Sequence, residues 1–505
     1  MKISNMPANG KKVIVVGAGL GGLTAAIKAA NAGFEVQVYE KNEHPGGKAG
    51  SVNLDGFRFD TGPSLLTMPF VIQQLFKDCG RNIDDYLKLK PLDQSCKYFY
   101  PDGTVINAYR DKTKFAAEVE AKTSVKAADV HRFLDYSKKI YDLTADLFLF
   151  SPFRGIKSFL NGKAFRTLLN LRKIDSTRTM DEAVRSFFKD GRVVQLFNRY
   201  ATYNGSNPYE APATLNIIPH VEHNLGTFVP EEGINAVAEA LFKLALEFGV
   251  KFDFKTEVER IFYKNGKVFA VHANKYDQFC DAVICNSDIT YAYTQMINLP
   301  KSKKMVKRVH HDASSSALVY YWGVKGISEN LEIHNILFSE HYFKEFEDIF
   351  ERKIPPDDPT IYIYISSKYK PSDAPQGHEN WYVMVNAPFN HNQNWKHEAA
   401  YMKDEILDKI ERILKIDLRE RIVAEDILTP DLIEERTLSY RGSLYGISSN
   451  GRYNAFLRQS NRSKDIKGLY FCGGSAHPGG GIPLVVLSGN HAANCLEEDL
   501  NSGKL

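Results

Sequence analysis

Residues 12–40 have the sequence KVIVVGAGLGGLTAAIKAANAGFEVQVYE. The run Lys12–Val16 is apolar and β-branched, which predicts a buried strand. Gly21–Ala32 is rich in alanine and predicts a helix, and Glu35–Tyr39 alternates like a second strand. A strand, a helix and a second strand in close succession predict a βαβ unit with parallel strands.

Three glycines lie between the first strand and the helix in G-x-G-x-x-G spacing: Gly17, Gly19 and Gly22. The first permits the tight turn, the second lets a pyrophosphate approach the backbone at the helix N-terminus, and the third lets helix and strand pack closely. Glu40 ends the second strand, where an acidic residue accepts a hydrogen bond from a ribose hydroxyl. This context predicts a dinucleotide site, and it fits NAD and FAD alike.

The composition narrows the function classes. The chain has 505 residues, and its 64 basic and 61 acidic side chains leave a net charge of +3. So small a charge excludes the basic bias of a dedicated nucleic-acid binder. With 43% hydrophobic and 25% charged residues, the chain is of globular type and long enough for about two to four lobes.

The cysteines and the apolar runs of the sequence indicate in which cellular compartment the protein is expected. None of the six cysteines forms a C-x-x-C pair, which argues against a disulfide framework or a zinc ribbon and favours a reducing cytosol. Val13–Ile27 resembles the apolar part of a signal peptide, but its four glycines argue against one. No run reaches the roughly 18 apolar residues of a membrane span, so we expect no transmembrane anchor.

The segment after Glu40 favours FAD. Its sequence PGGKAG, residues 45–50, resembles the second glycine pair of two-dinucleotide-binding-domain flavoproteins. The resemblance implies that Lys41, Gly47 and Lys48 lie at the cofactor. Lys48 stands where these flavoproteins usually have arginine, so the charge that neutralises a pyrophosphate is kept and the bidentate geometry is lost.

Two further segments resemble the bacterial carotenoid (phytoene) desaturase family of FAD-dependent oxidoreductases. The first is FRFDTGPS, residues 57–64, whose D-T-G-P part lies near the isoalloxazine in that family; an ordinary strand and turn is the alternative. The second is the string HPGGGIP, residues 477–483, before a helix expected from about Leu484 to Leu496. The resemblance extends from Val13 to Leu496 and implies further cofactor contacts at Gly62, Pro63, Ser64, Val258, Gly474, Gly481 and Ile482.

The expected fold class is α/β. It consists of a Rossmann-like FAD-binding domain with an inserted mixed α+β substrate domain and a helical membrane-associated segment. We expect FAD-binding parts at residues 1–80, 226–290 and 441–505, a helical, membrane-associated substrate region at 81–225, and a substrate-binding sheet domain at 291–440. In the last of these, strands are predicted at Ala317–Val324, Ile361–Ser366 and Trp381–Ala387, and an amphipathic helix at His397–Leu414. Such a sheet walls a long apolar tunnel or forms ordinary core, and the pattern fits both.

Two basic stretches bear on membrane contact. Leu147–Ile174 mixes apolar and basic residues, as interfacial segments do, and internal packing fits equally well. The basic run between Lys301 and Arg308 is typical of a solvated helix face. The expected partners are a carotenoid, a membrane lipid surface, and a quinone or oxygen as electron acceptor, in a cytoplasmic protein bound peripherally to the membrane.

The resemblance implies an enzyme that introduces C=C bonds into a polyene by hydride transfer to flavin, and it is strongest to the subgroup of 1'-hydroxycarotenoid 3,4-desaturases. Phytoene desaturases, retinol saturases and amine oxidases share the fold, and a non-catalytic lipid escort protein is an alternative of another class. The weak candidates for a catalytic role are Arg154 and His477, each with a structural alternative. His220-x-x-His223 lacks a third ligand nearby, so no metal site is predicted.

Overall fold

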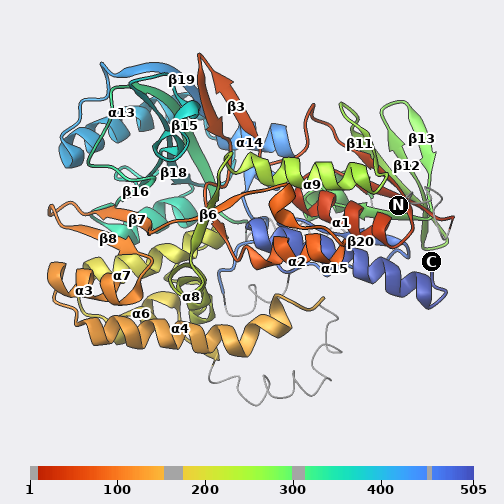
Figure 1. The fold of residues 1–505 in the computed structure, drawn as a ribbon, viewed down its shortest axis with the longest axis horizontal. Coiled ribbons are helices and arrows are strands. Elements are labelled where there is room, and N and C mark those ends of the chain that lie inside the picture. Colours follow the sequence, from red (N-terminus) through yellow and green to blue (C-terminus); the bar gives the residue numbers. More distant parts are fainter. Residues whose placement is uncertain (1–9, 153–173, 298–312, 452–457) are drawn as a thin grey trace.

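The βαβ unit of residues 12–40 forms the centre of a five-stranded parallel sheet (Figure 1). The computed structural model describes residues 10–152, 174–297, 313–451 and 458–505. The sheet has the order β10-β2-β1-β14-β20. Its strands are β1 (Lys12–Val16), β2 (Glu35–Tyr39), β10 (Lys251–Asp253), β14 (Ala282–Cys285) and β20 (Leu469–Phe471). Strands from four distant parts of the chain therefore build one sheet, which confirms the α/β class.

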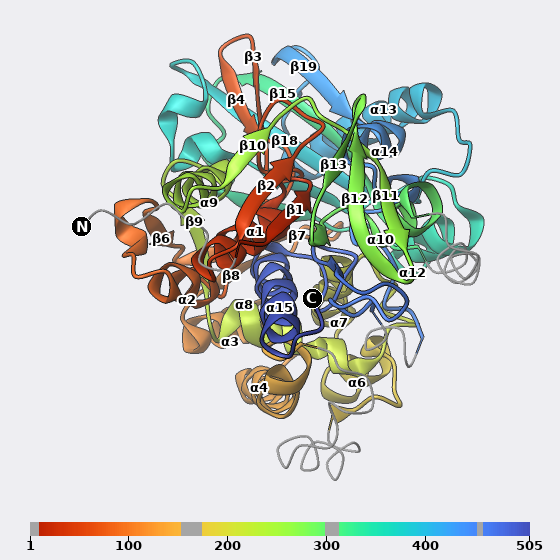
Figure 2. The same cartoon turned by 90° about the vertical axis from the view of Figure 1, so that its right-hand side faces the viewer.

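Both faces of the parallel sheet are covered. Val13 and Val15 pack in a core with helices α1 (Leu20–Asn31), α9 (Asn235–Glu247) and α15 (Ile482–Asn501). The alternate residues Ile14 and Val16 pack against the antiparallel sheet of β11 (Val258–Lys264), β12 (Lys267–Ala273) and β13 (Tyr276–Phe279). This alternation follows from the period of two along a strand. Figure 2 shows α15 beside α1, with β11–β13 on the other side of β1.

Close backbone packing holds α1 against its neighbours. A Cβ atom on Gly22 would overlap the carbonyl oxygen of Gly17 in the turn before the helix. A Cβ atom on Gly489 of α15 would overlap the carbonyl oxygen of Gly21. The two helices therefore approach each other more closely than side chains would permit at these positions.

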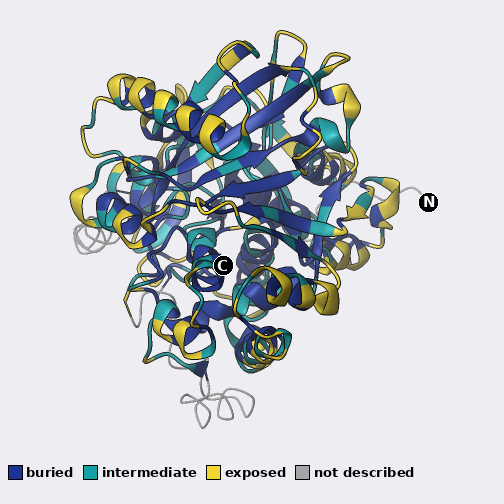
Figure 3. Ribbon diagram, turned by 90° about the vertical axis from the view of Figure 1, so that its left-hand side faces the viewer, coloured by how far each residue is buried: buried dark blue, intermediate teal, exposed yellow. Residues whose placement is uncertain are grey.

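The second large sheet has seven strands in the order β19-β15-β18-β17-β16-β7-β8. All neighbours are antiparallel except β16 and β7. The strands are β7 (Gln94–Phe99), β8 (Val105–Tyr109), β15 (Ser316–Lys325), β16 (His334–Leu337), β17 (Ile361–Tyr364), β18 (His378–Ala387) and β19 (Ile422–Leu428). One face packs on helix α13 (Trp395–Leu414), and Figure 3 shows that the strands at the centre of the molecule are buried.

A layer of helices lies below this sheet in Figure 1. It consists of α3 (Lys112–Lys122), α4 (Ala127–Phe148), α6 (Met180–Phe187), α7 (Gly191–Asn198) and α8 (Ile217–His223). Their core is rich in aromatic rings and includes residues of β7, β8 and β16. The region 81–225 thus supplies two strands of the sheet as well as helices, and the division into five segments stays a prediction.

Smaller elements connect these layers. They are β3 (Ser51–Leu54), β4 (Phe57–Asp60), β5 (Leu66–Thr67), α2 (Phe70–Asp78), β6 (Leu89–Pro91), β9 (Thr227–Pro230), α10 (Ile289–Tyr291), α12 (Tyr342–Glu347) and α14 (Pro430–Thr437). Strands β5 and β6 pair with β9, and β3 pairs with β4.

The predicted elements are found, with some differences in extent. Helix α15 begins at Ile482 rather than Leu484 because Pro483 is tolerated in a first helical turn. It also continues past Leu496, and Arg462 pairs there with Glu498 and Asp499. The region 291–440 contains β16 and β19 in addition to the three predicted strands.

The predicted membrane segment is described only in part. Helix α4 ends at Phe148, and residues 153–173, including Arg154, lie outside the described residues. The same holds for the whole basic run from Lys301 to Arg308, since residues 298–312 are not described. None of the described helices combines the length and the apolar composition that crossing a bilayer requires.

The contact between α1 and α15 is testable with a single methyl group. We expect Gly489→Ala to lower the free energy of unfolding by about 1–3 kcal/mol, because the added Cβ would overlap backbone of α1. Gly191→Ala is the matched control, since a Cβ there meets no atom within 4 Å, and we expect a change within about 0.5 kcal/mol. Urea unfolding of both variants measures the difference, and equal stabilities would contradict the packing argument.

Candidate active site

One cavity of about 1540 Å³ connects the carboxyl ends of the parallel strands with the inner face of the seven-stranded sheet. It is lined by all the predicted cofactor residues except Gly22: Gly17, Gly19, Glu40, Lys41, Gly47, Lys48, Gly62, Pro63, Ser64, Val258, Gly474, Gly481 and Ile482. Gly22 lies beneath the turn, where it permits close packing. The carboxyl ends of parallel strands are where such sheets bind ligands.

The turn between β1 and α1 is held from below by a residue that the sequence analysis did not select. Asn286 follows β14, and its Nδ2 would lie 2.8 Å from a Cβ atom on Gly19. Its Oδ1 would lie 2.7 Å from a Cβ atom on Gly21 and accepts from the Cys472 thiol at 3.5 Å. The position directly after a parallel strand was the available signal for Asn286.

Glu40 is fixed at the edge of this turn. Its Oε2 accepts from the backbone N–H of Ala18 at 2.7 Å, and its Oε1 accepts from that of Asn42 at 2.9 Å. The carboxylate is buried yet lines the cavity. A carboxylate held in this way is placed to accept further hydrogen bonds from a diol such as ribose.

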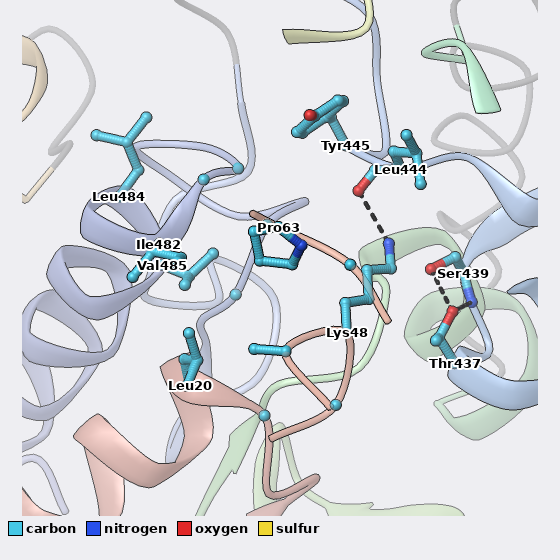
Figure 4. A pocket seen from close by; sticks show the side chains of 18 of the residues that line it. Leu20, Lys48, Pro63, Thr437, Ser439, Leu444, Tyr445, Ile482, Leu484 and Val485 are labelled. Atoms are coloured by element: carbon cyan, nitrogen blue, oxygen red, sulfur yellow. Dashed lines mark hydrogen bonds between the residues drawn. The ribbon is translucent and has the colours of Figure 1, made fainter. Parts of the chain in front are cut away.

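Lys48 lies in the cavity wall, and its side chain points toward Leu444 (Figure 4). Its Nζ donates to the carbonyl oxygen of Leu444 at 2.9 Å and to that of Ser443 at 3.3 Å. Burial lowers the pKa of Lys48 to about 8, and the nearby carboxylate of Asp288 opposes that change. Burial in turn raises the pKa of Asp288. The contact of Lys48 with a pyrophosphate stays a prediction, as does that of Lys41, whose Nζ donates to the carbonyl oxygen of Glu435 at 2.8 Å.

The N-terminus of α15 opens into the same cavity. Gly481 precedes the helix with a φ of +98°, a left-handed conformation that favours glycine, and no side chain caps the first turn. Ile482, Leu484 and Val485 lie in the wall near Leu20 and Pro63 in Figure 4. The positive end of this helix dipole suits an electron-rich ring edge or a phosphate.

Arg458 adds a cation beside that helix and was not predicted. Its Nη1 donates to the carbonyl oxygens of Gly474 and Tyr445, both at 2.9 Å. Burial lowers the pKa of Arg458 to about 10. The guanidinium therefore stays protonated at neutral pH and lines the cavity next to the glycine-rich turn.

The D-T-G-P segment packs directly against the second glycine motif. A Cβ atom on Gly62 would overlap the carbonyl oxygen of Lys48, so the two loops are in direct contact. Asp60 does not reach the cavity; it accepts from the first N–H groups of the helix region at Ile234 and Asn235, at 3.1 and 3.2 Å, and pairs with Arg58. The segment thus links the second glycine motif to the start of α9, and its contact with the flavin ring stays a prediction.

His477 has a structural environment as well as a place in the cavity wall. Its Nε2 contacts the carbonyl oxygen of Ser151 at 3.0 Å, and its own carbonyl oxygen accepts from Asn461 and Ser488. Burial lowers the pKa of His477 to about 4, so the ring is neutral at physiological pH. These contacts fit the structural alternative, and a catalytic role for His477 stays a prediction.

The seven-stranded sheet combines both of the alternatives considered for it. On one face Leu318, Tyr320 and Trp322 pack against α13 as ordinary core. On the other face a row of residues in register lines the cavity: Leu428, Val319, Met384, Tyr362 and Ile336. The sheet is therefore both core and cavity wall, on alternate residues.

The two histidines with metal-like spacing have other partners. Asn224 Nδ2 lies 2.7 Å from His220 Nδ1, and the Tyr200 hydroxyl lies 2.8 Å from His223 Nε2. Among the described residues no three candidate ligands come together.

The donor set fits an FAD. The glycine turn packs so closely on Asn286 that a Cβ atom on Gly19 or Gly21 would overlap that side chain, and Glu40 stands at the end of β2. An uncapped helix N-terminus and the cations Lys48 and Arg458 face the same space. The fold and the site together define an FAD-dependent oxidoreductase of the doubly wound type.

Comparison with known proteins identifies the family. The model of the flavin containing amine oxidoreductase family matches residues 20–496, and the chain belongs to this family. The chain is 42% identical to a 1-hydroxycarotenoid 3,4-desaturase of a Flavobacterium species over 96% of this chain and 99% of that protein. It is 35% identical to a 4,4'-diapolycopene oxygenase of a Methylomonas species over 97% and 99%.

The solved structure of cyclohexylamine oxidase from Brevibacterium oxydans shares the fold, with a TM-score of 0.61 and 15% identity over 97% of this chain and 100% of that one. The family membership confirms that the chain is an enzyme and that its cofactor is FAD. It sets aside the alternative of a non-catalytic escort protein.

The position of Glu40 predicts a loss of FAD affinity when its charge is removed. We expect Glu40→Gln to raise the Kd for FAD by about 10-fold or more, because a hydrogen bond to a charged acceptor is lost. Quenching of flavin fluorescence on titration of the apoprotein measures this. The control is Glu35→Gln, which removes the same charge from an exposed pair with Lys251 at the other end of β2, away from the cavity. Equal Kd values for both variants would exclude Glu40 from the cofactor site.

Lys48 predicts a pH dependence of the same Kd. With a pKa of about 8 in the apoprotein, Lys48 is charged below this pH and becomes neutral above it. We therefore expect FAD affinity to fall as the pH rises through about 8, because an anionic pyrophosphate binds the charged form. In Lys48→Gln this dependence is expected to disappear. An unchanged pH profile in the variant would show that Lys48 does not act on the cofactor.

Proposed function

We propose that this chain is a carotenoid desaturase that introduces the 3,4 double bond into a hydroxylated carotenoid. The observation that carries the proposal is the single cavity, which joins the dinucleotide cradle to a long apolar wall on the sheet. A polyene requires such a wall. The 42% identity over nearly the full length of both chains supports the 3,4-desaturase activity named for the Flavobacterium relative.

A carotenoid substrate also implies contact with a membrane. Exposing a polyene of about 40 carbons to water costs on the order of 20–30 kcal/mol at about 0.8 kcal/mol per buried carbon. Transfer directly from lipid avoids that cost. We therefore propose peripheral binding at the cytoplasmic membrane face, supported by the apolar and basic composition of Leu147–Ile174. Fractionation of expressing cells tests this, and recovery only in the soluble fraction would count against it.

When bound, FAD supplies the acceptor for the hydride that leaves the substrate. The substrate loses that hydride from one carbon and a proton from the neighbouring carbon, and the electron pair left behind forms the new π bond. Reoxidation of the cofactor would require an acceptor that takes up two electrons and two protons, and we propose a quinone or oxygen for this role.

The protein contributes orientation and exclusion of water. Val319, Met384 and Leu428 offer a flat apolar surface along which an extended polyene aligns. On the cofactor side, the Glu40 carboxylate, the Lys48 ammonium and the uncapped turn of α15 would hold the ribose, the phosphates and the ring. Fixed polar groups at one end and an apolar wall at the other keep the reacting carbons in one orientation.

A second activity is favoured by one observation. The relative from Methylomonas is 35% identical and is named an oxygenase. An oxygenase adds oxygen to its substrate, whereas a desaturase removes two hydrogens. Product mass therefore separates the two activities, and it separates phytoene desaturation, retinol saturation and amine oxidation as well.

The activity can be tested by expressing this chain in strains that make phytoene, lycopene or a hydroxylated acyclic carotenoid. We expect a product only from the hydroxylated carotenoid, two hydrogens lighter and with its absorption shifted to longer wavelength because the conjugated system is longer. Chromatography with mass detection measures both. The Glu40→Gln variant serves as a control with less bound flavin and is expected to give less product.

Gain of oxygen in the product would overturn desaturation in favour of the oxygenase activity. Conversion of phytoene instead would overturn the assignment to hydroxylated substrates.

A further inference from the structure

His334 is a polar residue in the cavity wall formed by the seven-stranded sheet. It begins β16, is only 3% exposed, and lines the cavity. Its ring stacks on Tyr364 at a centroid distance of 5.1 Å, and its Nδ1 lies 2.8 Å from the hydroxyl of Tyr362. Its Nε2 is buried and has no hydrogen-bond partner among the described residues. A buried nitrogen left in that state is costly unless a ligand meets it.

The nearby charged groups do not compete for this nitrogen. Glu222 accepts from Arg199 at 3.0 Å, from Tyr200 at 2.8 Å and from Tyr203 at 2.6 Å, so both its oxygens are engaged. These groups form a closed network at the end of the cavity. Nε2 of His334 therefore keeps no partner among the described residues of this wall.

Hydrogen bonds connect His334 to the cofactor side of the cavity. The Tyr362 hydroxyl, which contacts His334, lies 2.5 Å from Ser64 Oγ. Ser64 follows Pro63 in the D-T-G-P segment, which is in direct contact with the second glycine motif. His334 is therefore two hydrogen bonds away from the loop expected next to the flavin ring.

The chemistry of the ring defines its ligand. Burial lowers the pKa of His334 to about 3, with Arg199 acting in the same direction and Glu222 against it, so the ring is neutral. A neutral imidazole has one donor and one acceptor nitrogen, and the Tyr362 hydroxyl can serve either. Nε2 then requires an acceptor in one tautomer and a donor in the other. An alcohol provides both, whereas an ether or a carbonyl only accepts.

We propose that Nε2 of His334 binds the hydroxyl group of a hydroxylated polyene and makes His334 the residue that selects such substrates. This inference rests on the proposed function. In a 1-hydroxycarotenoid desaturated at carbons 3 and 4, one carbon separates the hydroxyl-bearing carbon from the reacting pair. The alcohol must therefore bind close to the flavin ring, as the chain of contacts from Ser64 to His334 requires.

The expected selectivity follows from the free-energy cost of leaving Nε2 of His334 buried without a hydrogen-bond partner. A polyene without the hydroxyl leaves Nε2 buried against carbon, and sites built around a polar contact reject such analogues strongly. We expect the wild-type protein to bind the hydroxylated polyene about 10- to 100-fold more tightly than the same polyene without the hydroxyl.

The test compares binding of these two polyenes by the FAD-loaded protein, read from the shift of the carotenoid visible band. His334→Phe keeps a flat ring stacked on Tyr364 and removes both nitrogens. We expect it to abolish the preference, because the hydroxylated polyene loses its hydrogen bond and the other polyene no longer meets a buried nitrogen. We expect His334→Gln to restore part of the preference. An equal loss for both polyenes in His334→Phe would indicate a packing role and overturn the proposal.

Tyr342 supplies the matched control. Its hydroxyl is also buried in the cavity wall and has no partner among the described residues. We expect Tyr342→Phe to leave the preference unchanged. Loss of the preference in Tyr342→Phe but not in His334→Phe would place the alcohol elsewhere and overturn the assignment.

Separate measurements of polyene binding and of product formation distinguish a failure of this inference from a failure of the proposed function. A wild-type protein that prefers the hydroxylated polyene but forms no desaturated product would support the alcohol site and contradict the desaturase function. A protein that desaturates the hydroxylated carotenoid but binds both polyenes equally would support the function and overturn the alcohol site.

Discussion

Direct contact between backbones, at positions that tolerate no side chain, is the constraint on which the cofactor site depends. The carbonyl oxygens of Gly17, Gly21 and Lys48 each meet a glycine across the contact. These contacts set the distance of α1 from its own turn, of α15 from α1, and of the D-T-G-P loop from the second glycine motif. The cradle is thus an outcome of packing between elements far apart in the chain.

The sheet shows how one set of strands serves two purposes. Residues on its outer face fill an ordinary core with α13, and those on its inner face border the cavity. Polar groups on the inner side are mostly neutralised by one another. Burial alone would raise the pKa of Glu222, yet Arg199, His223 and two tyrosine hydroxyls lower it overall, so the carboxylate is held as an ion. The network isolates charge from a wall that is otherwise suited to hydrocarbon.

Local sequence patterns were sufficient to predict the fold class, but they were insufficient to predict the cavity. The βαβ unit and helix α15 carry strong local signals, and both were predicted. The short strand β16, with sequence HNIL, and β19, with Glu425 and Asp426, have weak ones and were missed. Asn286, Arg458 and His334 act through contacts with residues remote in sequence. A cavity wall and a core are also both apolar, so alternation of side chains cannot distinguish them.

The order of the parallel sheet has a consequence for biosynthesis. Strand β1 lies between β2 and β14, and β14 lies between β1 and β20, near residue 470. The helix that completes the cradle follows β20. A nascent chain on the ribosome therefore carries the first glycine turn without the strand and helix that close it until translation has passed β20 and α15. Capture of the cofactor must await these two elements, and until then the apolar faces of β1 and α1 need protection from other chains.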